Sequence, residues 1–445
     1  MISKFCGLTL AIFQISLTPT CAQPAVANSL SLADAKRLAF ERNWDLLAAQ
    51  TGVDAATAQL LVAKEFPNPT FSYSTAKIGS HENSTPVGNG LWSRSYDTIF
   101  AVNQLIEIGG KRRDRKTSAE AGIAGAHARF YDARRLLDQG VTKAYVAALL
   151  AGENARILSG SASLLRHETE IAQARLKAGD ISDSDEKQIE NNGDVYALQA
   201  KSAEAAAVQA RIAVEILLGE SQPSGHWKPA ETLAQMAFTA PQTDASKTNA
   251  IRPDVLAAQA DLNQSKSDLK LQKAMRIPDP TFSFLVEHNP PGGGPPEDTV
   301  GIGVSFPLPL WNLNGGEIKS AQATVDKNAL ALAKAKAQAV ADVANAQSEF
   351  SEASERLARY QNQILPKSQK VRESVAFAFE KGGATLVDLL EAERADNDAR
   401  LATAQALSDT ASAVADLQAA TKAIDLTKVR PWNFSRKSAC WSSPL

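Results

Sequence analysis

The hydrophobic pattern consists of two kinds of segment, and each kind occurs twice along the chain. In the longer segments apolar residues recur every three or four positions, which is the period of an amphipathic helix. From Gly110 to Lys177 this pattern continues without a proline and links Phe130, Leu137 and Val141. We therefore predict a very long helix here, about 100 Å if it is straight. In the shorter segments every second residue is apolar, which is the period of a strand.

Four short segments show the strand pattern. The first two follow a helix that opens with the capping-box-like run Ser31–Asp34, runs towards Phe66 and is stopped by Pro67 and Pro69. The apolar positions of the four strands, in chain order, are Phe71 and Tyr73, then Phe100 and Val102, then Phe282 and Phe284, then Ile302 and Val304. Small or polar residues stand between them, so each strand has one apolar face.

The chain is an internal duplication. Asp45–Gln50 (DLLAAQ) recurs as Asp254–Gln259 (DVLAAQ), and Pro67–Tyr73 (PNPTFSY) recurs as Pro278–Phe284 (PDPTFSF). In both halves a helix, two strands and a long helical hairpin follow one another in the same order. We therefore divide the chain into a first repeat over 31–220, a linker over 221–248, a second repeat over 249–424 and a tail over 425–445.

The first residues have the composition of an export signal. Lys4 precedes an apolar run over 5–17 that is too short to span a bilayer, and small residues of the kind that a signal peptidase reads follow it. We predict a cleaved signal over 1–22, with a second cleavage position after residue 27. Cys21 lacks the preceding small residues of a lipoprotein signal. Beyond the signal only Cys440 remains, so no internal disulfide is expected.

Composition and charge argue against several classes of function. Hydrophobic residues make up 44% of the chain, which argues against disorder, whereas aromatic residues make up only 6%. Lys and Arg (47) nearly balance Asp and Glu (49), which gives no basis for nucleic-acid binding. The five histidines are scattered, and no nucleophile elbow, dinucleotide fingerprint or paired-cysteine zinc motif occurs. We expect neither an enzyme nor a bound cofactor or metal.

The strand pattern and the export signal together indicate an outer membrane. No run of eighteen apolar residues is evident after the signal, so a chain that spans a membrane would do so as a β-barrel. Four strands cannot close a barrel, and an open edge in lipid leaves backbone groups without partners. Three chains would supply twelve strands, an even number within the known range. We therefore predict a mainly α fold with transmembrane β. It is a trimeric channel-tunnel, with a 12-stranded barrel and antiparallel helical hairpins that form a periplasmic tube.

These features together resemble the TolC-like outer-membrane efflux proteins. The resemblance rests on Leu32–Ala35 with Arg42 and Asn43, the proline-led strands, the Gly109–Arg112 step and the two glycine-to-aspartate turns, and it covers both halves. Within the family, Ile108–Arg112 (IGGKR) is most similar to the outer-membrane components of heavy-metal cation efflux systems. The resemblance implies a homotrimer in outer-membrane lipid. Its periplasmic end would dock onto a periplasmic adaptor protein that joins an inner-membrane pump.

The resemblance also puts the two hairpin turns at the far periplasmic end. There it implies adaptor docking at Arg175, Gly179, Asp185, Gly382 and Asp388. Glycine lets the chain reverse between two helices, and a carboxylate is favoured at the start of the helix that returns. The two aspartates thus have two interpretations: a structural one as helix caps and a functional one in adaptor docking.

The second turn carries two further expectations. Asp388 and Glu391 are three residues apart on one helix face, so a trimer would carry a candidate acidic constriction ring that favours cations. In the family a tyrosine and an arginine near this turn help to hold the closed state. Phe379 and Ala384 occupy the matching positions here, so those hydrogen bonds would be missing.

The main interpretation is a passive exit duct of a tripartite efflux system across the periplasm and the outer membrane, with heavy-metal cations as candidate cargo. The same architecture would also serve as the outer-membrane duct of a protein-secretion system. A third alternative belongs to another class, a periplasmic adaptor or structural coiled-coil protein without a pore. Such a protein needs only one helical hairpin and soluble β domains, so the duplicated unit disfavours it.

Overall fold

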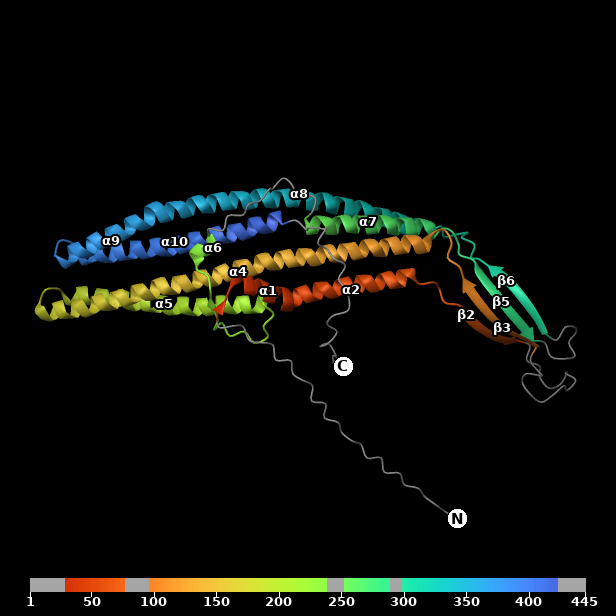
Figure 1. The fold of residues 1–445 in the computed structure, drawn as a ribbon, viewed down its shortest axis with the longest axis horizontal. Coiled ribbons are helices and arrows are strands. Elements are labelled where there is room, and N and C mark those ends of the chain that lie inside the picture. The colour runs from red at the N-terminus through yellow and green to blue at the C-terminus, as the bar shows by residue number, and fades with distance from the viewer. Residues whose placement is uncertain (1–28, 77–95, 238–251, 289–297, 423–445) are drawn as a thin grey trace, which may run out of the picture.

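The protein is a long rod with a small sheet at one end and two helical turns at the other (Figure 1). The computed structural model describes residues 29–76, 96–237, 252–288 and 298–422, so the predicted signal and tail lie outside the described residues. The helices are α1 (Leu32–Arg42), α2 (Trp44–Lys64), α4 (Lys111–Ala178), α5 (Asp183–Leu217), α6 (Leu233–Ala237), α7 (Pro253–Ala274), α8 (Gly315–Arg359), α9 (Leu365–Glu380) and α10 (Leu386–Thr421). The strands are β1 (Ser29–Leu30), β2 (Thr70–Ala76), β3 (Tyr96–Leu105), β4 (Lys228–Pro229), β5 (Thr281–His288) and β6 (Asp298–Ser305).

The sheet at the end of the rod is antiparallel, with strand order β2-β3-β5-β6. Its register brings the predicted apolar positions into rows that cross all four strands. One row joins Phe71 to Val102, Val102 to Phe284 and Phe284 to Ile302. On the opposite face the Asn103 side chain accepts a 2.7 Å hydrogen bond from the Ser283 hydroxyl. The predicted strands and their single apolar face are therefore confirmed.

The four strands continue into four helices that keep the same order. α2 packs against α4, α4 against α7, and α7 against α8, so the rod begins as one layer of strands and goes on as one layer of helices (Figure 1). α4 has 68 residues and continues past this layer to the far turn, a length of about 100 Å. One edge of the layer is formed by β2 and α2, and the other by β6 and α8.

The other half of the rod contains the two helical hairpins. α4 and α5 form the first, while α10 returns against α8 and α9 to form the second and also packs on α4. Leu332, Ala339, Ala346 and Ala353 of α8 are buried at intervals of seven residues, which is the coiled-coil period. Because alanine is small, it lets neighbouring helix backbones approach closely.

The helix predicted from Ser31 towards Phe66 is in fact two helices that meet at Asn43. Asn43 has ψ 127°, and its side chain accepts a hydrogen bond from the Leu46 N–H (3.0 Å) and donates one to the Leu217 carbonyl (3.0 Å). An asparagine side chain competes with the helix backbone in this way and favours a cap. The chain also packs tightly here, because a Cβ on Gly219 would lie 2.4 Å from the Arg42 carbonyl oxygen.

The second long helix also departs from the expected pattern. α8 and α9 are joined by a π-helical turn over Tyr360–Ile364, which ends two residues before Pro366. Proline has no N–H to donate to the preceding turn and its ring crowds the helix, so the backbone widens at this point. The second hairpin therefore contains an irregular turn that has no counterpart in α4.

α2 is the most apolar of the long helices, although Asp45, Asp54 and several Gln and Thr residues interrupt its apolar sequence. Within the described residues it is the one helix that is long and apolar enough, by length and composition alone, to cross a membrane. In the fold it lies in the layer against α4, and only 11% of its most apolar window is buried within the chain.

The linker between the repeats packs onto the middle of the rod. β4 pairs in parallel with β1, and the Tyr145 ring stacks on Trp227 with its centre 5.7 Å away. The Tyr145 hydroxyl lies 2.8 Å from the Leu30 carbonyl and also contacts Glu231. Burial, together with the Glu231 carboxylate, raises the pKa of Tyr145 well above its ordinary value. This fully buried tyrosine ties the start of the chain to α4.

Candidate functional site

The two hairpin turns at the end of the rod have the same backbone geometry. Gly179 has φ +81° and Gly382 has φ +77°. At the first turn Gly179 N–H donates to Leu176 O (3.0 Å), and at the second Gly382 N–H donates to Phe379 O (3.1 Å). A Cβ on either glycine would meet no atom within 4 Å, so the requirement for glycine comes from the left-handed backbone and not from space.

The two predicted aspartates are both parts of capping boxes. At α5 the Ser182 hydroxyl accepts from the Asp185 N–H (3.1 Å), and at α10 the Thr385 hydroxyl accepts from the Asp388 N–H (3.2 Å). The Asp388 carboxylate accepts in turn from the Thr385 N–H (2.9 Å) and hydroxyl (2.6 Å). The hydrogen bonds from Thr385 lower the pKa of Asp388. Both aspartates therefore have the capping role that the sequence offered as their structural interpretation.

The two turns are joined by a contact that sequence reasoning missed. The Arg175 guanidinium lies over the Phe379 ring, 5.4 Å from its centre, so a side chain of the first hairpin rests on one of the second. Beneath it Ala172, Ile189 and Leu386 form a buried cluster, with Phe379 partly buried against it. Phe379 stands where the family has a hydrogen-bonding tyrosine, and here its ring contacts the Arg175 guanidinium instead.

Glu391 lies one helical turn beyond Asp388 and is exposed. It lines a groove of about 200 Å³ between α10 and the first hairpin, together with Gln188 and Arg394. In a single copy Asp388 is committed to its cap, so the two carboxylates do not form one cluster. The acidic ring stays a prediction about an assembly of copies.

A charged group is buried further inside the second hairpin. Asp396 accepts hydrogen bonds from Arg400 (2.7 Å) and Ser368 (3.1 Å), and Arg372 lies within 3.5 Å of both Asp396 and Glu393. Burial raises the pKa of Glu393, and the nearby Asp396 carboxylate adds to that effect against the opposing charge of Arg372. These contacts fasten α9 to α10 below the π-helical turn.

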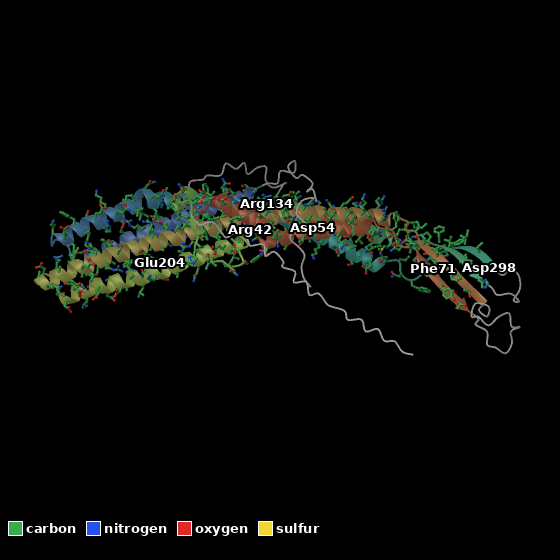
Figure 2. All side chains as sticks on the ribbon, turned by 60° about the horizontal axis from the view of Figure 1, so that its bottom comes forward. Arg42, Asp54, Phe71, Arg134, Glu204 and Asp298 are labelled. Atoms are coloured by element: carbon green, nitrogen blue, oxygen red, sulfur yellow. The ribbon has the colours of Figure 1, made fainter. Side chains whose placement is uncertain are left out.

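The predicted strand face is exposed in the single chain. The exposed fraction is 69% for Phe71 and 86% for Ile302, at the two edges of the sheet. Phe71, labelled in Figure 2, lies on β2, whereas Phe100 on the inner strand β3 is partly buried beneath Tyr73 at 5.2 Å between ring centres. A contiguous exposed apolar face is uncommon in water and indicates a lipid or protein partner.

The junction between sheet and helices uses the basic residues that follow Gly110. The Lys111 ammonium is buried and lies 2.8 Å from the Asp279 carboxylate and 2.6 Å from the Ile277 carbonyl. Asp279 also accepts from the Ile108 N–H (2.9 Å), so the proline-led loop of the second repeat holds the glycine step of the first. The same motifs that carried the resemblance therefore meet in space.

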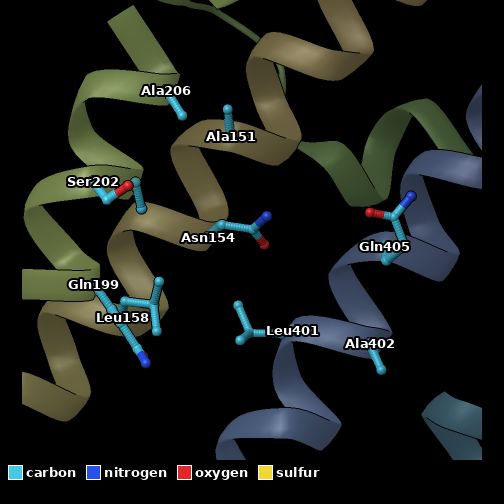
Figure 3. A pocket seen from close by; sticks show the side chains of 10 residues that line it. Ala151, Asn154, Leu158, Gln199, Ser202, Ala206, Leu401, Ala402 and Gln405 are labelled. Atoms are coloured by element: carbon cyan, nitrogen blue, oxygen red, sulfur yellow. The ribbon is translucent and has the colours of Figure 1, made fainter. Parts of the chain in front are cut away.

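A further groove separates the first hairpin from α10. Its volume is about 600 Å³, and Figure 3 shows Asn154 of α4 between Ser202 of α5 and Gln405 of α10. The lining consists of alanine, leucine, amide and hydroxyl side chains. The Asn154 amide oxygen is buried and has no hydrogen-bond partner in the described part of the chain. The two hairpins are thus joined at their turns and where α10 packs on α4. The uncharged groove lies between α4, α5 and α10.

Among the described residues, no group of three or more His, Cys, Asp and Glu side chains is arranged to hold a metal ion. His288 of β5 lies 2.7 Å from Asp298 of β6 at the loop end of the sheet.

Comparisons with known proteins agree with this geometry. The sequence model of the family described as "Outer membrane efflux protein" matches residues 36–220 and 245–421. The cobalt-zinc-cadmium resistance protein CzcC of Cupriavidus metallidurans is 25% identical over 386 residues, which cover 87% of this chain and 88% of CzcC. The nickel and cobalt resistance protein CnrC of the same organism is 27% identical, over 77% of this chain and 79% of CnrC. The solved structure of the Neisseria gonorrhoeae MtrE outer membrane channel, in its open state, has a TM-score of 0.72 at 23% identity and covers 88% of each chain.

Proposed function

The chain belongs to the outer membrane efflux protein family, and on that premise we propose that three copies close into one duct that crosses the outer membrane and the periplasm. The sheet of each copy supplies four of the twelve strands of a barrel. The helical layer and the hairpins form the tube beneath it. The observation that carries the proposal is the four-stranded sheet, which has one apolar face and, in the part of the chain that the structure describes, a free edge on each side.

The free edges give the physical reason for association. Within the described residues β2 pairs only with β3, and β6 pairs only with β5. A free edge in lipid leaves N–H and C=O groups without hydrogen bonds, at a cost of several kcal/mol per group. Pairing β2 of one copy with β6 of the next removes every free edge once three copies form a ring. The predicted lipid-facing side chains then form one continuous band around the barrel.

The hairpin turns are the proposed docking end. Gly179 and Gly382 have open space around them, so the helical tips of a periplasmic adaptor can approach the backbone closely. Arg175, Asp185 and Asp388 stand beside them. The energy for transport comes from an inner-membrane pump, because the duct itself is passive.

Heavy-metal cations are the proposed cargo. CzcC and CnrC, both named for resistance to such metals, support this choice of substrate class. Glu391 of three copies contributes the proposed acidic ring near the turns, where carboxylates attract cations and repel anions. Asp388 belongs to this ring only if its cap opens.

A deletion strain tests the function. Loss of this chain is expected to increase sensitivity to cobalt, zinc, cadmium or nickel and to leave sensitivity to hydrophobic antibiotics unchanged. Complementation with the native chain should restore resistance, and a Glu391→Gln variant should restore it less completely. The reverse pattern, with antibiotics affected and metals not, would contradict the proposed cargo but not the duct. A chain that fractionates with the soluble periplasm would contradict the duct.

A further inference from the structure

The apolar face of the sheet continues past its last strand into the segment that leads to α8. β6 ends at Ser305, but apolar residues still occupy every second position, as Phe306, Leu308 and Leu310, and all three are exposed. The residues between them are prolines, which have no N–H to donate, so this stretch needs no partner strand. Trp311 follows and is 93% exposed. If the apolar face of the sheet meets lipid, this apolar segment, residues 306–313, lies at the periplasmic boundary of that lipid.

A row of basic side chains ends beside the apolar segment. Lys266, Lys270 and Lys273 are exposed at steps of four and three residues, so they share one face of α7, and Arg276 follows directly after the helix. The Arg276 guanidinium donates from Nε to the Leu313 carbonyl (3.0 Å), which places it against the apolar segment. We refer to these four cations as the basic row.

The basic row has no neutralising partner within the described ranges. Its three lysines form no hydrogen bond or ion pair there, and the Arg276 side chain makes only its hydrogen bond to the Leu313 carbonyl. Asp268, the acidic residue that interrupts the row in the sequence, accepts a 2.5 Å hydrogen bond from the Ser118 hydroxyl of α4. α7 lies between α4 and α8 in the middle of the layer, so copies that associate along the edges of the layer leave the basic row open.

The first repeat shows that the fold itself does not require the basic row. α2 stands where α7 stands in the second repeat, and both helices pack against α4. When the two repeats are aligned on Pro67 and Pro278, the positions of the basic row correspond to Ala55, Gln59, Val62 and Glu65. A cation near the end of a helix suits the helix dipole, but α2 forms without a row of this kind. The charges therefore indicate a partner outside the chain.

We propose that the basic row binds the headgroups of anionic phospholipids in the periplasmic leaflet of the outer membrane. The inference rests on the proposed function, because it requires the sheet to stand in that membrane. With the apolar segment at the edge of the acyl chains, the basic row stands at the depth of the phosphates, where each Lys or Arg is attracted. A zwitterionic headgroup has no net charge to offer, so an anionic phospholipid is the class that fits.

Native mass spectrometry of the assembled protein in lipid nanodiscs tests the inference. The nanodiscs contain phosphatidylethanolamine and phosphatidylglycerol in equal parts, and the lipids that remain bound after release are identified. The native protein should retain phosphatidylglycerol preferentially. Lys270→Gln with Lys273→Gln should reduce this preference by at least about tenfold, because each basic residue near an anionic surface contributes a factor of about five. Lys270→Arg with Lys273→Arg keeps both charges and should keep the preference.

The matched control removes two charges far from the membrane. Lys334 and Lys336 are also exposed and lie about 30 Å along α8 from its start, so Lys334→Gln with Lys336→Gln should leave the lipid preference unchanged. An equal loss of preference in this control would overturn the inference, because the attraction would then belong to the charged surface as a whole. A particle of three copies that retains both lipids equally would also overturn it and leave the proposed duct intact.

Lysine acetylation in detergent, without lipid, distinguishes lipid from protein as the occupant. Lys270 and Lys273 should react as readily as Lys334 in the assembled protein, because no protein covers them. Protection of Lys270 and Lys273 would show that a second copy covers the basic row and would overturn the inference. A chain that stays monomeric and soluble without detergent would overturn the duct together with the inference.

Discussion

The Arg175 guanidinium lies 5.4 Å from the centre of the Phe379 ring and links the turn of the first hairpin to the turn of the second. The contact stands at the position where related proteins were expected to use a tyrosine hydroxyl. It is supported by the buried cluster of Ala172, Ile189 and Leu386, which draws side chains from both hairpins. Among the residues that the structure describes, packing and a cation–π contact join the two turns, and no side-chain hydrogen bond does so.

Removing this contact is expected to loosen the end of the duct. An exposed cation–π contact is worth about 0.5–1 kcal/mol, so Arg175→Ala should raise the open fraction of the channel by about two- to fivefold. Single-channel recording in planar bilayers measures this directly. Lys381→Ala is the matched control, because the Lys381 ammonium lies 5.5 Å from the Phe377 ring within one hairpin. Equal open fractions for the native protein and both variants would show that the Arg175 contact does not hold the turns.

The turn glycines are expected to resist even a small substitution. Because Gly382 has φ +77° with open space around it, Gly382→Ala should cost about 1–2 kcal/mol through backbone strain alone. Gly160 also has open space but lies inside α4, so Gly160→Ala should be neutral or stabilising by up to about 1 kcal/mol. Thermal unfolding of both variants measures the two changes in stability. A similar loss of stability for Gly382→Ala and Gly160→Ala would argue against backbone strain at Gly382.

Adaptor docking at the turns is tested by a larger side chain at Gly179. Gly179→Leu should block export while leaving the amount of assembled protein in the membrane unchanged, because the side chain stands where an adaptor would approach. Export assays and quantitative blots of the membrane fraction provide the two readings. Normal export by this variant would weigh heavily against docking at the first turn.

Glu393 gives the second hairpin a specific dependence on pH. Burial raises its pKa above the ordinary carboxyl value of 4.5, so the folded state holds the proton more tightly than the unfolded state does. The contribution of this group to stability is therefore present at low pH and is lost as pH rises through the folded pKa. Glu393→Gln should raise the melting temperature at neutral pH and have little effect near pH 4. Glu391→Gln, at an exposed position on the same helix, is the control. If the melting temperatures of both variants depended on pH in the same way, the predicted effect of burial at Glu393 would be contradicted.

The junction between strands and helices should depend on Asp279. Its carboxylate holds the buried Lys111 ammonium at 2.8 Å, so Asp279→Ala leaves that ammonium without an opposite charge and should cost about 3 kcal/mol or more. Asp279→Asn should cost less, since its amide oxygen can still accept from the Ile108 N–H. Glu120→Ala breaks an exposed 3.5 Å pair with Lys116 and should change stability by less than about 0.5 kcal/mol. Denaturant unfolding that ranks these three variants differently would contradict the structural role of Asp279.

Much of the fold could be predicted from local patterns. The alternation at Phe71, Phe100, Phe284 and Ile302 gave the strands and their common face, since a two-residue period has no other interpretation in segments this short. The prolines and the left-handed glycines marked the ends of the elements. Asp388 was predicted as a cap because it stands at the start of the returning helix, where the helix N-terminus favours a carboxylate.

What the sequence did not reveal depends on contacts between distant segments. The break at Asn43 depends on the Leu217 carbonyl, which is 174 residues away in the chain. The Arg175–Phe379 contact joins different repeats, and the π-helical turn before Pro366 reflects a small backbone adjustment that no spacing rule predicts. The exposure of α2 was also not predicted, because an apolar helix has the same sequence pattern whether its own chain covers it or leaves it exposed.

The mass of the mature protein in detergent tests the central claim most directly. Native mass spectrometry of protein extracted from the outer-membrane fraction should show three copies in one particle, because within the described residues the sheet of one copy has two unpaired edges. A protein that is monomeric and freely soluble without detergent would contradict the duct, the strand pairing between copies and the acidic ring together.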